Sequence, residues 1–353
     1  MNLLDNPLYK EDIEYVSGLN LPWEKLNNKS IVISGATGML GSFLIDVLMS
    51  KNEKNLNCHI YALGRNEEKA RKRFGNYFGN NNFSFIECDI NSPSFTTKLP
   101  DQANYVFHAA SNTHPMAYAT DPIGTITANI FATNYFLEYC ANHKIDRFIL
   151  ASSNEIYGEN RGDVELFDEN YCGYINCNTM RAGYPESKRC SEALCQAYIA
   201  QRDIDAVIVR FTRSYGPTLL PTDTKAMSQF LHNGINHEDI VLKSMGEQYY
   251  SYTYVADAIS GMLTVMLKGE RGEAYNIASE TGDITLHDLA QEIATQAGTK
   301  VVFDIPEATE KAGFSTATKA RLDGSKIKKL GWELKYTIHD GIARTMTILS
   351  SAQ

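Results

Sequence analysis

Short apolar runs rich in β-branched residues alternate with longer amphipathic runs over the first 212 residues of the chain. This alternation predicts parallel strands joined by helices, with the sheet covered on both faces. The expected strands are residues 31–34, 59–63, 83–86, 105–111, 147–153 and 206–211. The expected helices are residues 42–49, 67–74, 123–142 and 184–200. Ligands of such α/β sheets bind beyond the carboxyl ends of the strands, so functional side chains are expected there.

The same pattern divides the chain into three parts. Residues 1–28 precede the first strand, and we expect an N-terminal extension without chemistry. Residues 29–212 carry the alternation and form the expected main domain. Beyond it the pattern loosens, with strands near 252–255 and 274–277 and helices near 226–233, up to 267, near 286–296 and at the C-terminus. Residues 213–353 are therefore expected to form a smaller substrate-binding lobe, interleaved with the main domain.

Three glycines spaced three apart follow the first strand and open the first helix. Gly35 would permit a sharp turn, Gly38 a close approach of backbone N–H groups to a diphosphate, and Gly41 close packing of the helix on the strand. The N-terminus of that helix would add unpaired N–H groups and a positive dipole end. This context favours a dinucleotide-binding, Rossmann-type domain over a βα turn that is merely tight.

The residues after the second and third strands bear on the choice of cofactor. NAD sites often carry an acidic residue after the second strand, but here the strand ends in Gly64 and Arg65. Arg65 would suit the 2′-phosphate of NADP, or it is a solvated arginine at the start of a helix. Asp89 follows the third strand and could face an adenine edge.

A tyrosine and a lysine four residues apart open the helix expected at 184–200. Tyr184 and Lys188 then lie on one helix face, where an ammonium would lower the pKa of the phenol. Such a tyrosine can take a proton from an alcohol while a nicotinamide takes the hydride. Ser153, at the end of the fifth strand, can hydrogen-bond the same oxygen. The alternative is a solvated surface pair.

Composition narrows the classes of partner. The chain has 353 residues and a formal charge of -9, without a long basic run, so neither nucleic acid nor an anionic membrane is expected. The N-terminus is polar and no apolar run is long enough for a bilayer. The seven cysteines are scattered, with no zinc-type spacing. We expect a cytoplasmic protein with reduced thiols and no metal site.

In order along the chain, these motifs resemble the extended short-chain dehydrogenase/reductase family (NAD-dependent epimerase/dehydratase type), in its nucleotide-sugar-modifying branch. The resemblance implies NAD or NADP, tightly bound and recycled, a nucleotide-diphosphate sugar substrate, and a homodimer built on the helices that contain Asn129 and Lys188. It also implies cofactor-binding residues, which are Gly35, Thr37, Gly38, Met39, Leu40, Gly41, Arg65, Asp89, Ile90, Ala109, Ala110, Ser111, Asn129 and Lys188.

Glu155 discriminates among reactions within that branch. Sugar 4-epimerases usually lack an acid there, whereas 4,6-dehydratases and uronate decarboxylases carry one. Asn154 replaces the Asp that glucose-type dehydratases use to protonate the leaving hydroxyl. The chain thus looks most similar to UDP-glucuronate decarboxylases, with Tyr184, Lys188, Ser153 and Glu155 as implied catalytic residues. A 4,6-dehydratase is the first alternative, followed by a 4-epimerase or 4-ketosugar reductase, and by a dinucleotide-sensing protein without catalysis.

Two substrate-site positions depart from the family pattern. Arg213 stands where the family usually has Asn, and Tyr250 where it usually has Arg. Arg213 could bind the substrate diphosphate in place of the missing arginine, bind a sugar carboxylate, or indicate a different substrate. The residues expected to contact the substrate are Ser111, Asn154, Arg181, Arg213 and Tyr250.

Overall fold

The computed structural model describes residues 2–113, 115–305 and 318–352. A parallel sheet of seven strands forms the body of the molecule, in the order β10-β6-β5-β4-β1-β2-β3. The strands are β1 (Ser30–Ser34), β2 (His59–Gly64), β3 (Phe83–Glu87), β4 (Tyr105–His108), β5 (Arg147–Ser153), β6 (Ala206–Phe211) and β10 (Ala274–Ile277). The predicted doubly wound α/β fold is confirmed.

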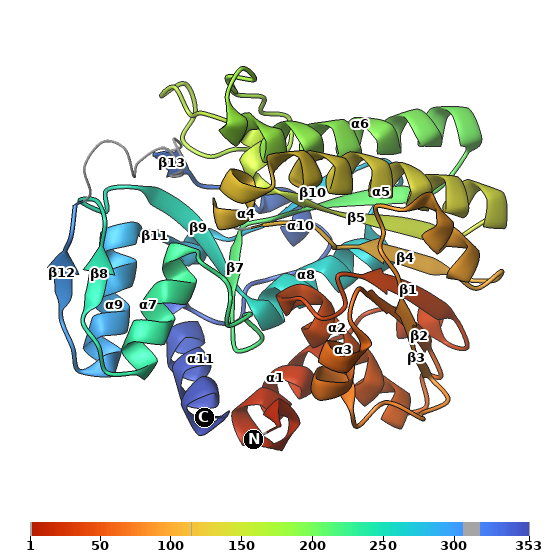
Figure 1. The fold of residues 1–353 in the computed structure, drawn as a ribbon, viewed down its shortest axis with the longest axis horizontal. Helices are drawn as coiled ribbons and strands as arrows, with labels where there is room; N and C mark the ends of the chain where they lie inside the picture. Colours follow the sequence, from red (N-terminus) through yellow and green to blue (C-terminus); the bar gives the residue numbers. More distant parts are fainter. Residues whose placement is uncertain (1, 114, 306–317, 353) are drawn as a thin grey trace.

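Helices cover both faces of this sheet (Figure 1). On one face, α5 (Pro122–His143) and α6 (Gly183–Arg202) lie side by side. The helices of the other face include α1 (Pro7–Ser17), α2 (Met39–Glu53) and α8 (Val255–Lys268). The edge of the sheet carries α3 (Glu67–Phe74).

Each central strand is buried on both sides, which explains its continuous apolar run. In β1, Ile31 and Ile33 belong to the hydrophobic core beneath α2 and α8, while Val32 belongs to the core beneath α5. Successive side chains of a strand point to opposite faces, so one apolar residue after another is needed where both faces are covered. Because both faces are covered, a ligand is expected at the carboxyl ends of the strands.

The second part of the chain forms small sheets beside the main one. One contains β7 (Arg213–Tyr215), β9 (Tyr249–Tyr254), β11 (Asp283–Thr285) and β13 (Lys319–Ala320), and the other pairs β8 (Ile240–Leu242) with β12 (Val301–Phe303). Its helices are α7 (Ala226–Ile235), α9 (Leu286–Ala297), α10 (Ser325–Lys328) and α11 (Ile338–Ala352). Because β10 and α8 return to the main body, the two parts are interleaved.

Several short elements complete the described ranges. They are α4 (Pro115–Thr120) and the 3-10 helices η1 (Leu3–Asp5), η2 (Trp23–Leu26), η3 (Pro93–Lys98), η4 (Asn154–Tyr157), η5 (Met180–Ala182) and η6 (Glu280–Gly282). None of the helices in these ranges combines the length and apolar character needed to cross a bilayer.

The N-terminal helix, expected as part of an extension, is built into the core. Tyr9 of α1 is fully buried and donates a 2.5 Å hydrogen bond to Asp46 of α2. Asp12 accepts hydrogen bonds from Tyr254 of β9 (2.6 Å) and from Arg344 of α11 (2.8 Å). The helix therefore connects the main sheet to the second part, as the adjoining termini in Figure 1 illustrate.

The fourth strand is shorter than expected. It ends at His108 instead of residue 111, because the N–H groups of Ala109 and Ala110 both donate to the Ser34 hydroxyl at 3.1 Å. The chain turns there and leaves residues 109–111 facing the carboxyl end of the sheet. The turn thus brings the loop after β4 next to the glycine turn after β1.

Candidate active site

The glycine turn connects β1 to α2 as the spacing predicted. Gly35 has a φ of 72°, and a Cβ on it would lie 2.9 Å from the backbone nitrogen of Ala110. A Cβ on Gly41 would collide with the carbonyl oxygen of Gly35. The N-cap of α2 is Gly38, which has no side chain to cap the first turn of the helix. The uncapped N–H groups, together with the closeness that only glycine permits, make this turn a fitting cradle for a diphosphate.

A cavity of about 760 Å³ opens above this turn, between the main sheet and the second part. It is lined by 16 of the residues named from the sequence. These are Gly35, Gly38, Met39, Leu40, Gly41, Ala109, Ala110, Ser111, Ser153, Asn154, Glu155, Arg181, Tyr184, Lys188, Arg213 and Tyr250. The fold therefore brings the glycine turn, the tyrosine–lysine pair and the two departing positions to one site.

Five named residues lie outside the cavity lining. Thr37, Arg65, Asp89 and Ile90 do not line it, and Arg65 and Asp89 are exposed to solvent. Asn129 is fully buried in α5, where its amide donates to Thr125 and to Ser187 of α6.

Tyr184 lies in the first turn of α6 and is 7% exposed. The expected lowering of its pKa is wrong for this structure. Burial raises the pKa of the phenol, and the Glu155 charge raises it further, whereas a hydrogen bond with Ser153 and the Arg181 charge lower it. The phenol is therefore protonated at neutral pH.

Lys188 lies beneath Tyr184 and points toward β5. Its ammonium donates a 2.8 Å hydrogen bond to the carbonyl of Ala151 and lies 6.0 Å from the centre of the Tyr184 ring. Burial lowers the pKa of Lys188 to about 8, and the Glu192 charge opposes that change. At this distance the ammonium does not offset the burial of the phenol, which explains the failed expectation.

Glu155 is held by an arginine beside the phenol. Nη2 of Arg181 lies 2.8 Å from each carboxylate oxygen of Glu155. The Arg181 guanidinium also lies over the ring of Tyr118, at 4.8 Å, and Tyr118 stacks on Tyr184 with ring centres 5.0 Å apart. Nε of Arg181 is buried and lacks a hydrogen-bond partner in the described part of the chain. A carboxylate, a guanidinium and a phenol thus meet at one wall of the cavity.

The two positions that depart from the family pattern are in contact. The guanidinium of Arg213, on β7, lies over the ring of Tyr250, on β9, at 3.4 Å from its centre. Nη1 of Arg213 is buried and has no hydrogen-bond partner among the residues that the structure describes. This side chain therefore has donor capacity available on the cavity wall.

Sequence reasoning missed several residues that line the cavity. Tyr118 lies on the short helix α4, which has too few residues for a periodic signal. Residues 223–230 and 241–244 of the second part also contribute, and there Lys225 is paired with Asp223 at 3.0 Å. Within the described ranges, no cluster of His, Cys, Asp or Glu could hold a metal ion.

Comparisons with known proteins agree with this architecture. Residues 31–278 match the model of the NAD dependent epimerase/dehydratase family. UDP-glucuronic acid decarboxylase 4 of Arabidopsis thaliana is 28% identical, over 94% of this chain and 72% of its own length. The crystal structure of UDP-glucuronic acid 4-epimerase from Bacillus cereus has a TM-score of 0.78 at 21% identity, covering 92% of this chain and all of that one.

A second solved structure resembles the fold to the same degree. The dTDP-glucose 4,6-dehydratase of Bacillus anthracis has a TM-score of 0.77 at 19% identity, covering 92% of this chain and 97% of that one. At such identities the structures attest the fold alone, while the family match spans well over half of the chain. The expected nicotinamide cofactor is confirmed by the family, which is NAD-dependent. The chain belongs to the NAD dependent epimerase/dehydratase family.

Proposed function

We propose that this protein oxidises a nucleotide-linked uronic acid at C4 and then decarboxylates it, as a UDP-glucuronate decarboxylase does. One observation carries the proposal: Tyr184, Ser153 and the Glu155–Arg181 pair border a single cavity whose floor is the glycine turn. An acid–base group beside a dinucleotide cradle is what reversible oxidation of an alcohol requires. The decarboxylase relative supports the choice of substrate.

The residues of the glycine turn fit NAD. Gly35, Gly38 and the uncapped start of α2 would hold the diphosphate, and residues 109–111 would border the rest of the molecule. Bound NAD would supply a hydride acceptor at C4 and return the hydride later. Because the matched family is NAD-dependent, we favour NAD over NADP.

Proton transfer falls to Tyr184. The minor phenolate form of Tyr184 takes the proton of the C4 hydroxyl and becomes the phenol, and Ser153 hydrogen-bonds the same oxygen. In the ketone so formed, the C5–C6 bond breaks, CO2 leaves, and the electron pair moves into an enolate at C4. The hydroxyls of Tyr184 and Ser153, residues that are 7% and 8% exposed, stabilise this negative oxygen. C5 then takes up a proton from water, and Tyr184 returns its proton to the C4 oxygen as C4 is reduced again. We assign Glu155 to the steps after oxidation, in which its carboxylate orients the 4-keto sugar.

Asn154 favours decarboxylation over dehydration. It lies on the cavity wall, is 7% exposed, and is an amide. An amide does not protonate a departing hydroxyl, which elimination of water at C6 needs. Loss of CO2 needs no such acid, because the carboxylate leaves as a neutral gas.

Arg213 is proposed as the main cation for the substrate's negative charge. Arg181 and Lys225 are paired with acidic side chains, whereas Nη1 of Arg213 has no hydrogen-bond partner within residues 2–113, 115–305 and 318–352. Stacking on Tyr250 fixes the guanidinium plane, which suits bidentate binding of a phosphate.

A homodimer built on α5 and α6 also remains part of the proposal. Ile123 and Phe131 are eight residues apart on α5, and they are 75% and 50% exposed. Large apolar side chains on one helix face are typical of an interface. Light scattering of the protein and of a Phe131→Glu variant tests this: the variant is expected to be monomeric, and a wild-type monomer would contradict it.

The proposed activity is tested by incubating the purified protein, with NAD present, with UDP-glucuronic acid and, separately, dTDP-glucose. Mass spectrometry of the nucleotides is expected to show a UDP-pentose from the first and no product from the second. A dehydrated 4-keto sugar from dTDP-glucose would instead establish the dehydratase alternative.

A further inference from the structure

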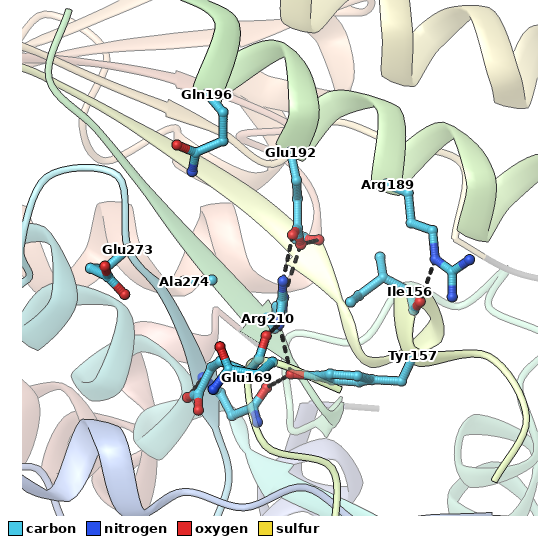
Figure 2. A network of polar contacts seen from close by, with 12 residues as sticks. Ile156, Tyr157, Glu169, Arg189, Glu192, Gln196, Arg210, Glu273 and Ala274 are labelled. Atoms are coloured by element: carbon cyan, nitrogen blue, oxygen red, sulfur yellow. Dashed lines mark hydrogen bonds and ion pairs between the residues drawn. The ribbon is translucent and has the colours of Figure 1, made fainter. Parts of the chain in front are cut away.

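A buried ion pair lies behind the cavity, between α6 and β6. Arg210 Nε is 3.0 Å from one carboxylate oxygen of Glu192, and Nη2 is 2.6 Å from the other (Figure 2). The two side chains are only 10% and 13% exposed, and neither residue lines the cavity. Two parallel bonds fix the carboxylate in position and orientation.

This pair is connected to each segment that carries a proposed catalytic group. Ser152, next to Ser153, donates a 2.5 Å hydrogen bond to Glu192. Arg210 donates at 2.9 Å to the hydroxyl of Tyr157, two residues after Glu155 in the same short helix. Glu192 itself lies one helical turn after Lys188 on α6.

The far end of the network is anchored in the sheet. The Tyr157 hydroxyl accepts from Arg210 and donates at 2.6 Å to Asn276 of β10. The Asn276 amide donates in turn to the carbonyls of Phe167 (2.9 Å) and Asp323 (3.0 Å). Every member has a partner, so the network is rigid and stays charge-balanced.

Glu192 is also an electrostatic neighbour of Lys188. Burial lowers the pKa of Lys188 to about 8, and the Glu192 charge opposes this. Of the other groups facing Lys188, Tyr184 on α6 is a neutral phenol and Ala151 on β5 offers a carbonyl. His108 on β4 is neutral, since burial and the nearby ammonium lower its pKa to about 3. Glu192 is thus the acidic side chain that supports the ammonium, within the described ranges.

We propose that Glu192 is a positioning residue for the Tyr184–Lys188 pair. Its carboxylate, clamped by Arg210, holds the end of β5 against α6 and keeps the Lys188 ammonium charged. The inference rests on the proposed proton-transfer role of Tyr184 and Lys188, but not on which sugar reaction follows.

The test replaces Glu192 by Gln, which keeps the shape and removes the charge. Lysine labelled with 13C gives an NMR titration of Lys188 without substrate, its signal being assigned by loss in Lys188→Arg. We expect the wild-type signal to titrate near pH 8, and the Glu192→Gln signal to titrate lower by about one unit or more. The high-pH limb of kcat/KM on the accepted nucleotide sugar should move by the same amount.

Two further variants separate electrostatics from stability. Asp205→Asn breaks the Arg147–Asp205 pair, which is also bidentate at 2.9 Å and lies at the other end of β5. It should lower the melting temperature and leave the Lys188 titration unchanged. Glu192→Gln leaves the buried Arg210 guanidinium without its carboxylate. The double variant Glu192→Gln/Arg210→Gln removes that charge as well, and it replaces the single variant in the test if the single variant does not fold.

The outcomes decide between the two roles. A lower titration pH of Lys188 in Glu192→Gln or in the double variant supports the proposal. If no nucleotide sugar is turned over, that result counts against the proposed function but not against the role of Glu192. A lower melting temperature with an unchanged Lys188 titration and pH profile would overturn it and leave Glu192 a purely structural residue.

Discussion

Arg181 and Glu155 form an ion pair in which one guanidinium nitrogen lies 2.8 Å from both carboxylate oxygens. The pair forms one wall of the cavity and acts on the Tyr184 phenol with opposite signs, since Glu155 raises its pKa and Arg181 lowers it. The two contacts from one arginine fix the orientation of the Glu155 carboxylate beside the phenol.

The Glu155→Gln variant tests the role of that carboxylate. We expect turnover to fall by about 100-fold or more, because a positioned acid–base group typically contributes that much. C4 oxidation should persist, so a 4-keto sugar nucleotide should accumulate in single-turnover reactions followed by mass spectrometry. Equal loss of oxidation and of product formation would contradict a role confined to the later step.

Replacing Tyr184 by Phe removes the proposed proton-transfer group and keeps the ring that stacks on Tyr118. The expected result is a loss of kcat of about 100- to 10,000-fold, with NAD affinity unchanged by isothermal titration calorimetry. A matched control is Tyr198→Phe, on the same helix but outside the cavity lining. That control should retain full activity.

The pH dependence follows from Lys188. Its pKa is lowered to about 8, so the ammonium is lost as pH rises through that value. If the ammonium assists Tyr184, kcat/KM should decline above about pH 8. For stability the sign is opposite: the folded state favours the neutral amine, so Lys188 costs stability below pH 8, and this cost disappears between pH 8 and the ordinary lysine value. A rate that still rises through pH 10 would argue against the assisting role.

Arg213→Ala should weaken substrate binding more than chemistry. Loss of a charge-assisted contact costs about 1.5–3 kcal/mol, which raises KM by about 10-fold or more. Arg321→Ala serves as the control, because that guanidinium also lies over a tyrosine ring, 4.6 Å from the centre of Tyr249, but outside the cavity lining; KM is expected within about threefold of wild type. A KM unchanged in Arg213→Ala would place the substrate's negative charge elsewhere.

Gly35→Ala tests the cradle for NAD. Gly35 and Gly298 have nearly the same φ, 72° and 69°, but a Cβ on Gly298 would meet no atom within 4 Å. Alanine at residue 298 should therefore cost only the strain of about 1 kcal/mol. At residue 35 it should additionally abolish NAD binding by calorimetry, since the Cβ would push the Ala110 backbone away. Equal effects of the two substitutions would refute the cradle.

The sequence predicted the main sheet because its strands are buried on both faces and therefore read as unbroken apolar runs, as in Ile31 to Ile33. Short elements such as β7 (Arg213–Tyr215) and β12 (Val301–Phe303) have three residues each, which is too few for a periodic signal. The role of α1 was missed because its buried members include Asp12, whose partners are distant in sequence.

The sequence predicted those site residues that belong to motifs of fixed spacing, such as Gly35 in the glycine turn and Tyr184 in the tyrosine–lysine pair. The site was not predictable where distant strands meet. Nothing in the sequence indicated that Arg213 would stack on Tyr250, or that Glu155 would form an ion pair with Arg181. The pKa of Tyr184 depends on burial, which a residue pair on one helix face does not reveal.

The most direct measurement follows UDP-glucuronic acid labelled with 13C at C6 by NMR, with the wild-type protein and NAD. The account predicts that the label leaves as CO2 in step with the appearance of an unlabelled UDP-pentose, and that Glu155→Gln blocks this release. Label retained in a hexuronic acid whose C4 configuration has inverted would contradict decarboxylation and make the protein an epimerase.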